Sequence, residues 1–198
     1  GFGRIRVNLN WNQSGGAPDV ATAKPGFLAR VFGKEGTKPA GVDLDLGCLF
    51  ELANGQCGGV QALGDAFGNF DRPPFINLDS DDRTGNVSGG ENLFINGAHF
   101  DQIRRVLVFA FIYDGVANWA ATDGVVSLEM PDQAPIEVRL DNGGEQSMCA
   151  IALIENRGGE LQVTKLAEYF NAVGNATAHE MLDRRFGFDL RWVAGSKD

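Results

Sequence analysis

The chain has 198 residues, of which 43% are hydrophobic and 10% aromatic. These values suit a single globular domain with a sizeable core and exclude a disordered chain. The formal net charge of −9 disfavours nucleic acid and anionic membrane surfaces as partners and matches cations or basic protein surfaces better. The longest unbroken apolar run, 106–113, is much shorter than the ~20 residues of a membrane-spanning helix. We therefore expect a soluble protein with no nucleic-acid partner and no direct membrane insertion.

The cysteines indicate a cellular compartment, and the start of the chain indicates a longer parent protein or processing. Cys48, Cys57 and Cys149 are odd in number and lack metal-type spacing, which indicates reduced thiols in a cytoplasmic compartment. The chain begins at Gly1 and enters a strand pattern almost at once, so we expect a segment cut from a longer protein or a processed start. No linker or repeat divides residues 1–198, and a single domain is expected.

Apolar and polar residues alternate along most of the chain, which is typical of strands that bury one face. The first two strands are expected at 3–11 and 42–52. They are separated by residues 12–40, a long loop or insertion that is rich in Gly, Pro, Ser and Lys. Residues 104–113 are apolar on both faces and predict a central strand. The other expected strands are 57–63, 92–96, 124–130, 135–141, 147–156, 160–169 and 188–193.

Helical signal is confined to residues 175–187. Thr177 and Glu180 have the spacing of a capping box, and Gly187 follows as a stop signal. About ten strands without strand–helix alternation predict an all-β fold, an antiparallel β-sandwich of two sheets with one short helix near the C-terminus.

The segment DSDDRTGNVSGGEN, residues 79–92, holds four acidic residues in a glycine-rich stretch. Calcium prefers six to eight oxygen ligands. A flexible, oxygen-rich loop therefore suits calcium better than it suits magnesium. No Cys/His cluster supports zinc. Set against the EF-hand loop, positions 1, 3, 5, 7, 9 and 12 are occupied by Ser80, Asp82, Thr84, Asn86, Ser88 and Glu91. Position 1 departs from the pattern and no helices flank the loop, so we expect similar chemistry on a β scaffold.

A second acidic pair lies on an expected strand. Asp43 and Asp45 are two residues apart and project from the same face, which we expect to be wet. A loop folded beside this strand could place Asp82 or Glu91 across from the pair. The alternative is two solvated aspartates beside a polar loop.

The stretches GVDLDLGCLFEL, DDRTGNVSGGENLFING and RVLVFAFIYDGVANWAATDGVV resemble the TerD-like tellurium-resistance stress proteins, and most of all the TerA-type branch. The resemblance runs from about Arg4 to Trp192 and implies a cytoplasmic, calcium-binding β-sandwich from bacterial stress-response operons. Asp43 and Asp45 match the family's DLD strand, and Asp81 and Asp82 match its acidic turn. The run of aspartates that usually follows is replaced by residues 86–90, which removes carboxylates from the ligand set.

The metal ligands expected from this resemblance and from the loop pattern are Asp43, Asp45, Asp81, Asp82, Asn86, Ser88 and Glu91. Asp114 follows the central strand where the resemblance places another loop near the metal. The expected function is non-enzymatic: calcium binding orders the acidic loop, which then docks other proteins of the tellurium-resistance system.

Other chemistries remain open at this point. A magnesium-dependent hydrolase or nucleotide-processing enzyme could use the same carboxylates, and a calcium-dependent module for sugars or anionic headgroups is a third possibility. His179 and Glu180 begin an HExxD string without the second histidine of a zinc protease, so a capping role for Glu180 is expected. With Asn118 and Asp123, Trp119 either forms a recognition surface or packs against the core edge, and core packing is favoured.

Overall fold

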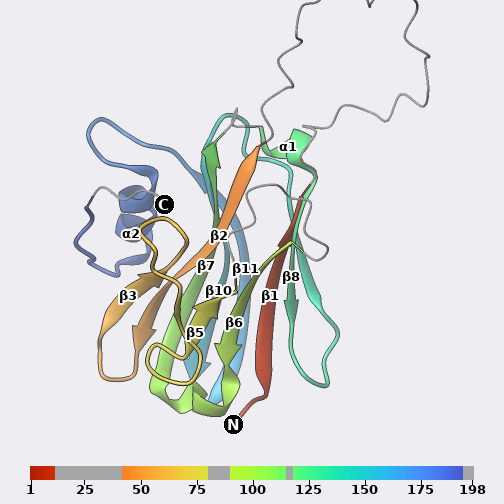
Figure 1. The fold of residues 1–198 in the computed structure, drawn as a ribbon, viewed down its shortest axis with the longest axis vertical. Helices are drawn as coiled ribbons and strands as arrows, with labels where there is room; N and C mark the ends of the chain where they lie inside the picture. The colour runs from red at the N-terminus through yellow and green to blue at the C-terminus, as the bar shows by residue number, and fades with distance from the viewer. Residues whose placement is uncertain (12–41, 80–89, 115–117, 194–198) are drawn as a thin grey trace, which may run out of the picture.

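The computed structural model describes residues 1–11, 42–79, 90–114 and 118–193. These residues form two sheets packed face to face, with a helix against one of them (Figure 1). Sheet A has the strand order β4-β5-β6-β1-β8-β9, and sheet B has the order β11-β10-β7-β2-β3. Every described ladder is antiparallel. The predicted β-sandwich is confirmed.

Most expected strands are present, with shifted ends. The strands are β1 Arg4–Asn10, β2 Asp43–Leu52, β3 Cys57–Val60, β4 Gly68–Asn69, β5 Ile76–Leu78, β6 Glu91–Asn96, β7 Ile103–Asp114, β8 Gly124–Glu129, β9 Ile136–Leu140, β10 Met148–Arg157 and β11 Glu160–Phe170. The helices are the 3-10 helix Gly97–Gln102, α1 Trp119–Thr122 and α2 Ala178–Phe186. Within the described residues, no helix has the length and apolar content needed to cross a membrane. The expected loop at 12–40 lies outside the described residues.

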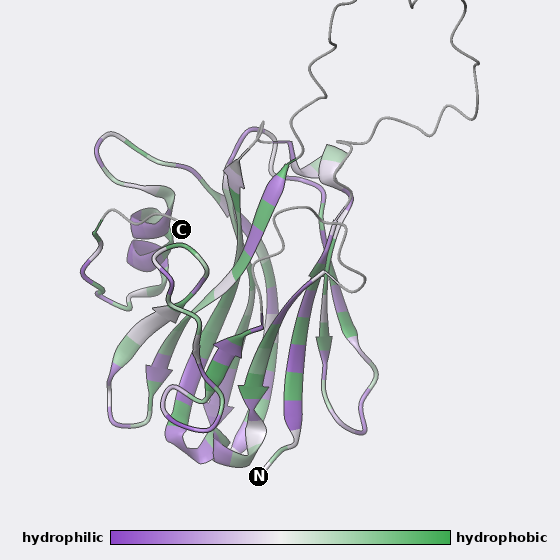
Figure 2. Cartoon of the chain, in the orientation of Figure 1, coloured by the Kyte–Doolittle hydropathy of each residue, from purple (hydrophilic) through white to green (hydrophobic). Residues whose placement is uncertain are grey.

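The main core fills the space between the sheets. Ile5, Val7 and Leu9 of β1 are completely buried, and they belong to the same apolar cluster as Leu44 and Leu46 of β2. Figure 2 shows the resulting bands of hydrophobic and hydrophilic residues along the strands. Each fully buried aliphatic side chain contributes about 1.5–3 kcal/mol, so alternation along the strands decides which face turns inward.

A second core covers the outer face of sheet B. Leu49 of β2 and Phe109 of β7 pack there with Leu182 of α2 and Phe188. This explains why β7 is apolar on both faces, and its predicted central position is confirmed. It also corrects the expectation for β2, whose outer face is buried instead of wet.

The helix α2 begins and ends where its sequence indicates. The Oγ of Thr177 accepts a hydrogen bond from the backbone N–H of Glu180 at 3.2 Å, and Gly187 takes the left-handed conformation at φ 68° that ends the helix. Arg105 of β7 donates from its guanidinium to the carbonyl oxygens of Phe186 and Gly187. A cation at a helix C-terminus is favourable, so Arg105 holds α2 against sheet B.

The predicted strand at 188–193 is wrong, because one carboxylate takes its backbone donors. Oδ1 of Asp183 accepts from the N–H groups of Phe188 and Asp189, both at 2.9 Å. Oδ2 accepts from the N–H of Leu190 and the indole Nε1 of Trp192, both at 2.8 Å. The segment therefore folds around the end of α2 and does not join a sheet.

Replacing Asp183 by asparagine tests this arrangement. The Asp183→Asn side chain keeps one acceptor oxygen, and its NH₂ group then faces two N–H donors. Because buried hydrogen bonds to a charged group are lost, we expect the free energy of unfolding to fall by about 2–4 kcal/mol. Urea unfolding measures it, with Asp189→Asn as a control on the exposed neighbour. An equal loss in both variants would contradict this role for Asp183.

Candidate metal centre

The strands that carry the ligand candidates share one end of the sandwich. β1 ends there, β2 and β6 begin there, and β5 and β7 end there (Figure 1). The described ligand candidates Asp43, Asp45, Glu91 and Asp114 all belong to this end. The predicted ligands Asp81, Asp82, Asn86 and Ser88 lie outside the described residues.

Asp43 and Asp45 are buried, with only 6% and 3% of their surface exposed. Alternation along β2 places them on the outer face of sheet B, because Leu44 between them faces the main core. Asp45 lies opposite Phe111 on β7. Both aspartates are therefore part of a covered sheet surface, and the alternative of solvated aspartates is not what the structure has.

A β-bulge decides which residue of β7 lies opposite Asp43 in the ladder. The β2–β7 register pairs Leu44 with Ile112 and then Asp43 with Asp114, so Tyr113 is the extra residue. Bulges redirect side chains and are frequent next to functional sites. Without the bulge, Tyr113 and not Asp114 would lie opposite Asp43.

Glu91 connects the two sheets. It is completely buried at the start of β6 in sheet A, and its Oε2 accepts a hydrogen bond from the backbone N–H of Leu46 in sheet B at 2.7 Å. The β2–β3 ladder pairs residues 48–51 with 57–60, so the Leu46 N–H lies on the part of the β2 edge beyond β3. The sequence indicated Glu91 as the residue that closes a loop, but nothing in it pointed to Leu46.

The chain reaches Glu91 through a glycine that no other residue can replace without strain. Gly90 has φ 65°, and a Cβ there would collide with the carbonyl oxygen of Leu9. The close approach lets β6 start directly beside β1, with Glu91 paired to Leu9. Gly90 thus sets the position from which the Glu91 side chain enters the core.

The chemistry of this end is that of hard oxygen donors. Carboxylates with few nitrogen or sulfur neighbours match calcium or magnesium and not zinc. In the part of the chain that the structure describes, no three His, Cys, Asp or Glu side chains lie close enough to hold a metal ion by themselves. The described carboxylates therefore do not form a complete metal site by themselves.

Trp119 is a core residue, as the favoured interpretation predicted. It is fully buried, and its Nε1 donates to the carbonyl of Gln146 at 2.5 Å. Asn118 caps α1 by accepting from the N–H of Ala121, and Asp123 ends α1 in the left-handed conformation. These residues shape a turn, and the buried indole of Trp119 is not part of a recognition surface.

His179 is a packing residue and not a metal ligand. Its ring lies 4.7 Å from the ring of Phe111 and 5.4 Å from that of Trp192, and its Nε2 hydrogen-bonds to Oε1 of Gln61 at 2.9 Å. Burial lowers the pKa of His179 from 6.5 to about 4, because the charged imidazolium loses its hydration. Gln61 lies far away in the sequence, so sequence analysis missed this pair.

Comparisons with known proteins agree with this architecture. No family model matches the chain. It is 44% identical over 197 residues to the tellurium resistance protein TerA of an Alcaligenes species, which covers 99% of this chain and 53% of that protein. The chain thus spans about half the length of this curated relative.

Two solved structures share the fold. One is a homologue of the telluride resistance protein TerD from Streptomyces coelicolor, with a TM-score of 0.59 and 17% identity over 91% of this chain and 98% of that one. The other is a protein of unknown function, with a TM-score of 0.58 and 17% identity over 91% of this chain and 97% of that one.

The depressed pKa of His179 predicts a loss of stability in acid. Between pH 6.5 and about 4 the unfolded chain binds a proton that the folded chain does not, so stability falls as the pH falls. The contribution lost between pH 7.5 and pH 5 is about 2 kcal/mol. Urea unfolding at the two pH values measures it, with the non-titrating His179→Gln variant as reference. An equal pH dependence in both proteins would contradict the assignment.

Proposed function

Because this chain belongs to the TerD-like tellurium-resistance family, we propose that it is a non-enzymatic, calcium-binding domain of a bacterial stress-response system that works in the cytoplasm. The observation that carries the proposal is the set of buried carboxylates at one end of the sandwich, those of Asp43, Asp45 and Glu91. The acidic segment 80–89 connects β5 to β6 at the same end. The chain covers half of its TerA relative, so the activity of the whole protein is part of this proposal.

The burial of the acids supports a cation. Ionised carboxylates are costly to remove from water, and all three of these side chains are buried. A bound calcium ion supplies the opposite charge. Asp43, Asp45 and Glu91 would offer oxygen atoms from the two sheets, with Asp114 following from the end of β7. Asp81, Asp82, Asn86 and Ser88 would complete the ligand set.

Calcium is preferred to magnesium because the donors come from several separate strand ends and a glycine-rich segment. Calcium accepts variable numbers of oxygen ligands, whereas magnesium demands a strict octahedron and keeps its waters. Ion binding would order residues 80–89 and create a surface for other proteins of the tellurium-resistance system.

The positions of the two histidines support a binding function over a hydrolytic one. His179 belongs to α2, and its buried ring packs against Phe111 of β7. His99 belongs to the 3-10 helix that connects β6 to the start of β7, and its ring stacks on Phe75 at 4.4 Å. His99 thus lies at the opposite end of β6 and β7 from Glu91 and Asp114. The Nε2 of His179 is hydrogen-bonded to Gln61, so it is not placed as the general base that a hydrolase would need.

Calorimetry of the metal-stripped protein tests the proposal. We expect micromolar or tighter calcium binding that persists in a physiological excess of magnesium. The variant Asp43→Asn with Asp45→Asn keeps the side-chain volumes and removes two charges, and it should weaken calcium binding by about tenfold or more, ~1.4 kcal/mol. Calcium should also raise the melting temperature of the wild-type protein.

The matched control is Asp101→Asn with Glu137→Gln, which makes the same charge change at exposed positions elsewhere. It should leave the calcium affinity nearly unchanged. If the strand variant binds calcium as tightly as the wild-type protein, Asp43 and Asp45 are not ligands and the proposed site is wrong.

A further inference from the structure

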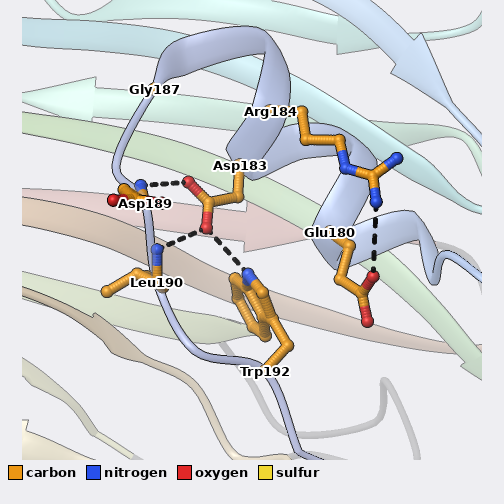
Figure 3. A pocket seen from close by; sticks show the side chains of 7 residues that line it. All are labelled: Glu180, Asp183, Arg184, Gly187, Asp189, Leu190 and Trp192. Carbon is orange, nitrogen blue, oxygen red and sulfur yellow. Dashed lines mark hydrogen bonds and ion pairs between the residues drawn. The ribbon is translucent and has the colours of Figure 1, made fainter.

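A groove separates the end of α2 from the segment that follows it (Figure 3). Its volume is about 480 Å³, and its lining includes Glu180, Arg184, Asp189 and Trp192. None of these residues belongs to the acidic end of the sandwich. The groove is large enough for one long side chain of another protein.

One wall of the groove is a fixed aromatic ring. The Nε1 of Trp192 donates to the buried carboxylate of Asp183 at 2.8 Å, as Figure 3 shows. The backbone of Leu190 is held by the same carboxylate. Because these contacts set the position of the indole in advance, a ligand that stacks on it loses little additional freedom in the protein.

The same part of the molecule twice combines a guanidinium group, an aromatic ring and a carboxylate. Arg105 lies over the ring of Phe188 at 3.9 Å and pairs with Glu51 at 3.0 Å. Arg185 lies over the ring of Phe186 at 4.8 Å and pairs with a carboxylate of β11 at 3.0 Å. Both examples show that this surface accommodates the guanidinium group of arginine.

The groove has the ring and the carboxylates of a third such arrangement. Among the described residues, no arginine or lysine lies over the indole of Trp192. Arg184 is close, but its guanidinium meets Glu180 at 4.0 Å across one helical turn. Asp189 adds a further negative charge at the rim, in a protein whose net charge is −9.

We propose that this groove binds the guanidinium group of an arginine side chain presented by a protein partner. A planar guanidinium stacks on an indole and forms paired hydrogen bonds to carboxylates, which the ammonium of lysine does less well. The net negative charge of the protein attracts a basic segment from a distance. Binding at the groove is independent of calcium, since Asp43 and Asp45 lie on β2.

The test uses N-acetylarginine amide as the probe and N-acetylcitrulline amide as its neutral isostere. The indole N–H of Trp192 is followed in ¹H–¹⁵N spectra and assigned by its loss in Trp192→Phe. Trp11 and Trp119 are internal controls, because their indole N–H groups bond to the carbonyls of Val42 and Gln146. We expect the arginine probe to shift the Trp192 signal saturably while the citrulline probe does not.

The variant Glu180→Gln with Asp189→Asn removes two negative charges from the lining of the groove. It should bind the arginine probe about threefold or more weakly, the effect of losing two ion pairs at the surface. Asp132→Asn is the control, since Asp132 is exposed and left-handed at φ 59° like Asp189 at φ 55°. Equal shifts with the two probes, or unchanged affinity in the rim variant, would overturn the proposal.

Discussion

The pairing of β2 with β7, covered on both faces, is the constraint on which the rest of the structure depends. Its inner face packs against sheet A through Leu44 and Leu46, and its outer face packs under α2 through Phe109. A strand pair buried on both sides cannot shift by one residue without exchanging two cores. The acids at its end are therefore held in a fixed frame, even though they follow the same alternation as the apolar residues.

Glu91 gives this frame its connection to sheet A. A carboxylate that crosses the sandwich to the Leu46 N–H makes a strong, charge-assisted hydrogen bond and satisfies a backbone donor on the β2 edge. It also places negative charge near the peptide that joins Asp45 to Leu46. In a low dielectric, charges interact more strongly than they do in water, so the position of each buried carboxylate matters.

The sequence predicted what depends on local pattern and missed what depends on distant partners. Alternation identified most strands, and Thr177 with Gly187 marked the ends of α2, because each signal lies within a few residues. The outer face of β2 was misjudged because α2, which covers it, comes more than a hundred residues later. The segment 188–193 was mistaken for a strand since its alternation is real, but Asp183 takes the N–H groups that a ladder would use.

The α2 unit and the acidic end share the β2–β7 pair but use different parts of it. Phe111 of β7 lies opposite Asp45 of β2, and its ring contacts that of His179. The ring of His179 contacts that of Trp192, so two ring contacts lead from Phe111 to the groove. Contacts alone do not couple two sites, because coupling requires an element with two arrangements that both sites bias. A ladder that is buried on both faces resists a change of register. Substitutions at Asp45 and at the groove should therefore act additively on stability, as they do for separate surfaces carried by one rigid frame.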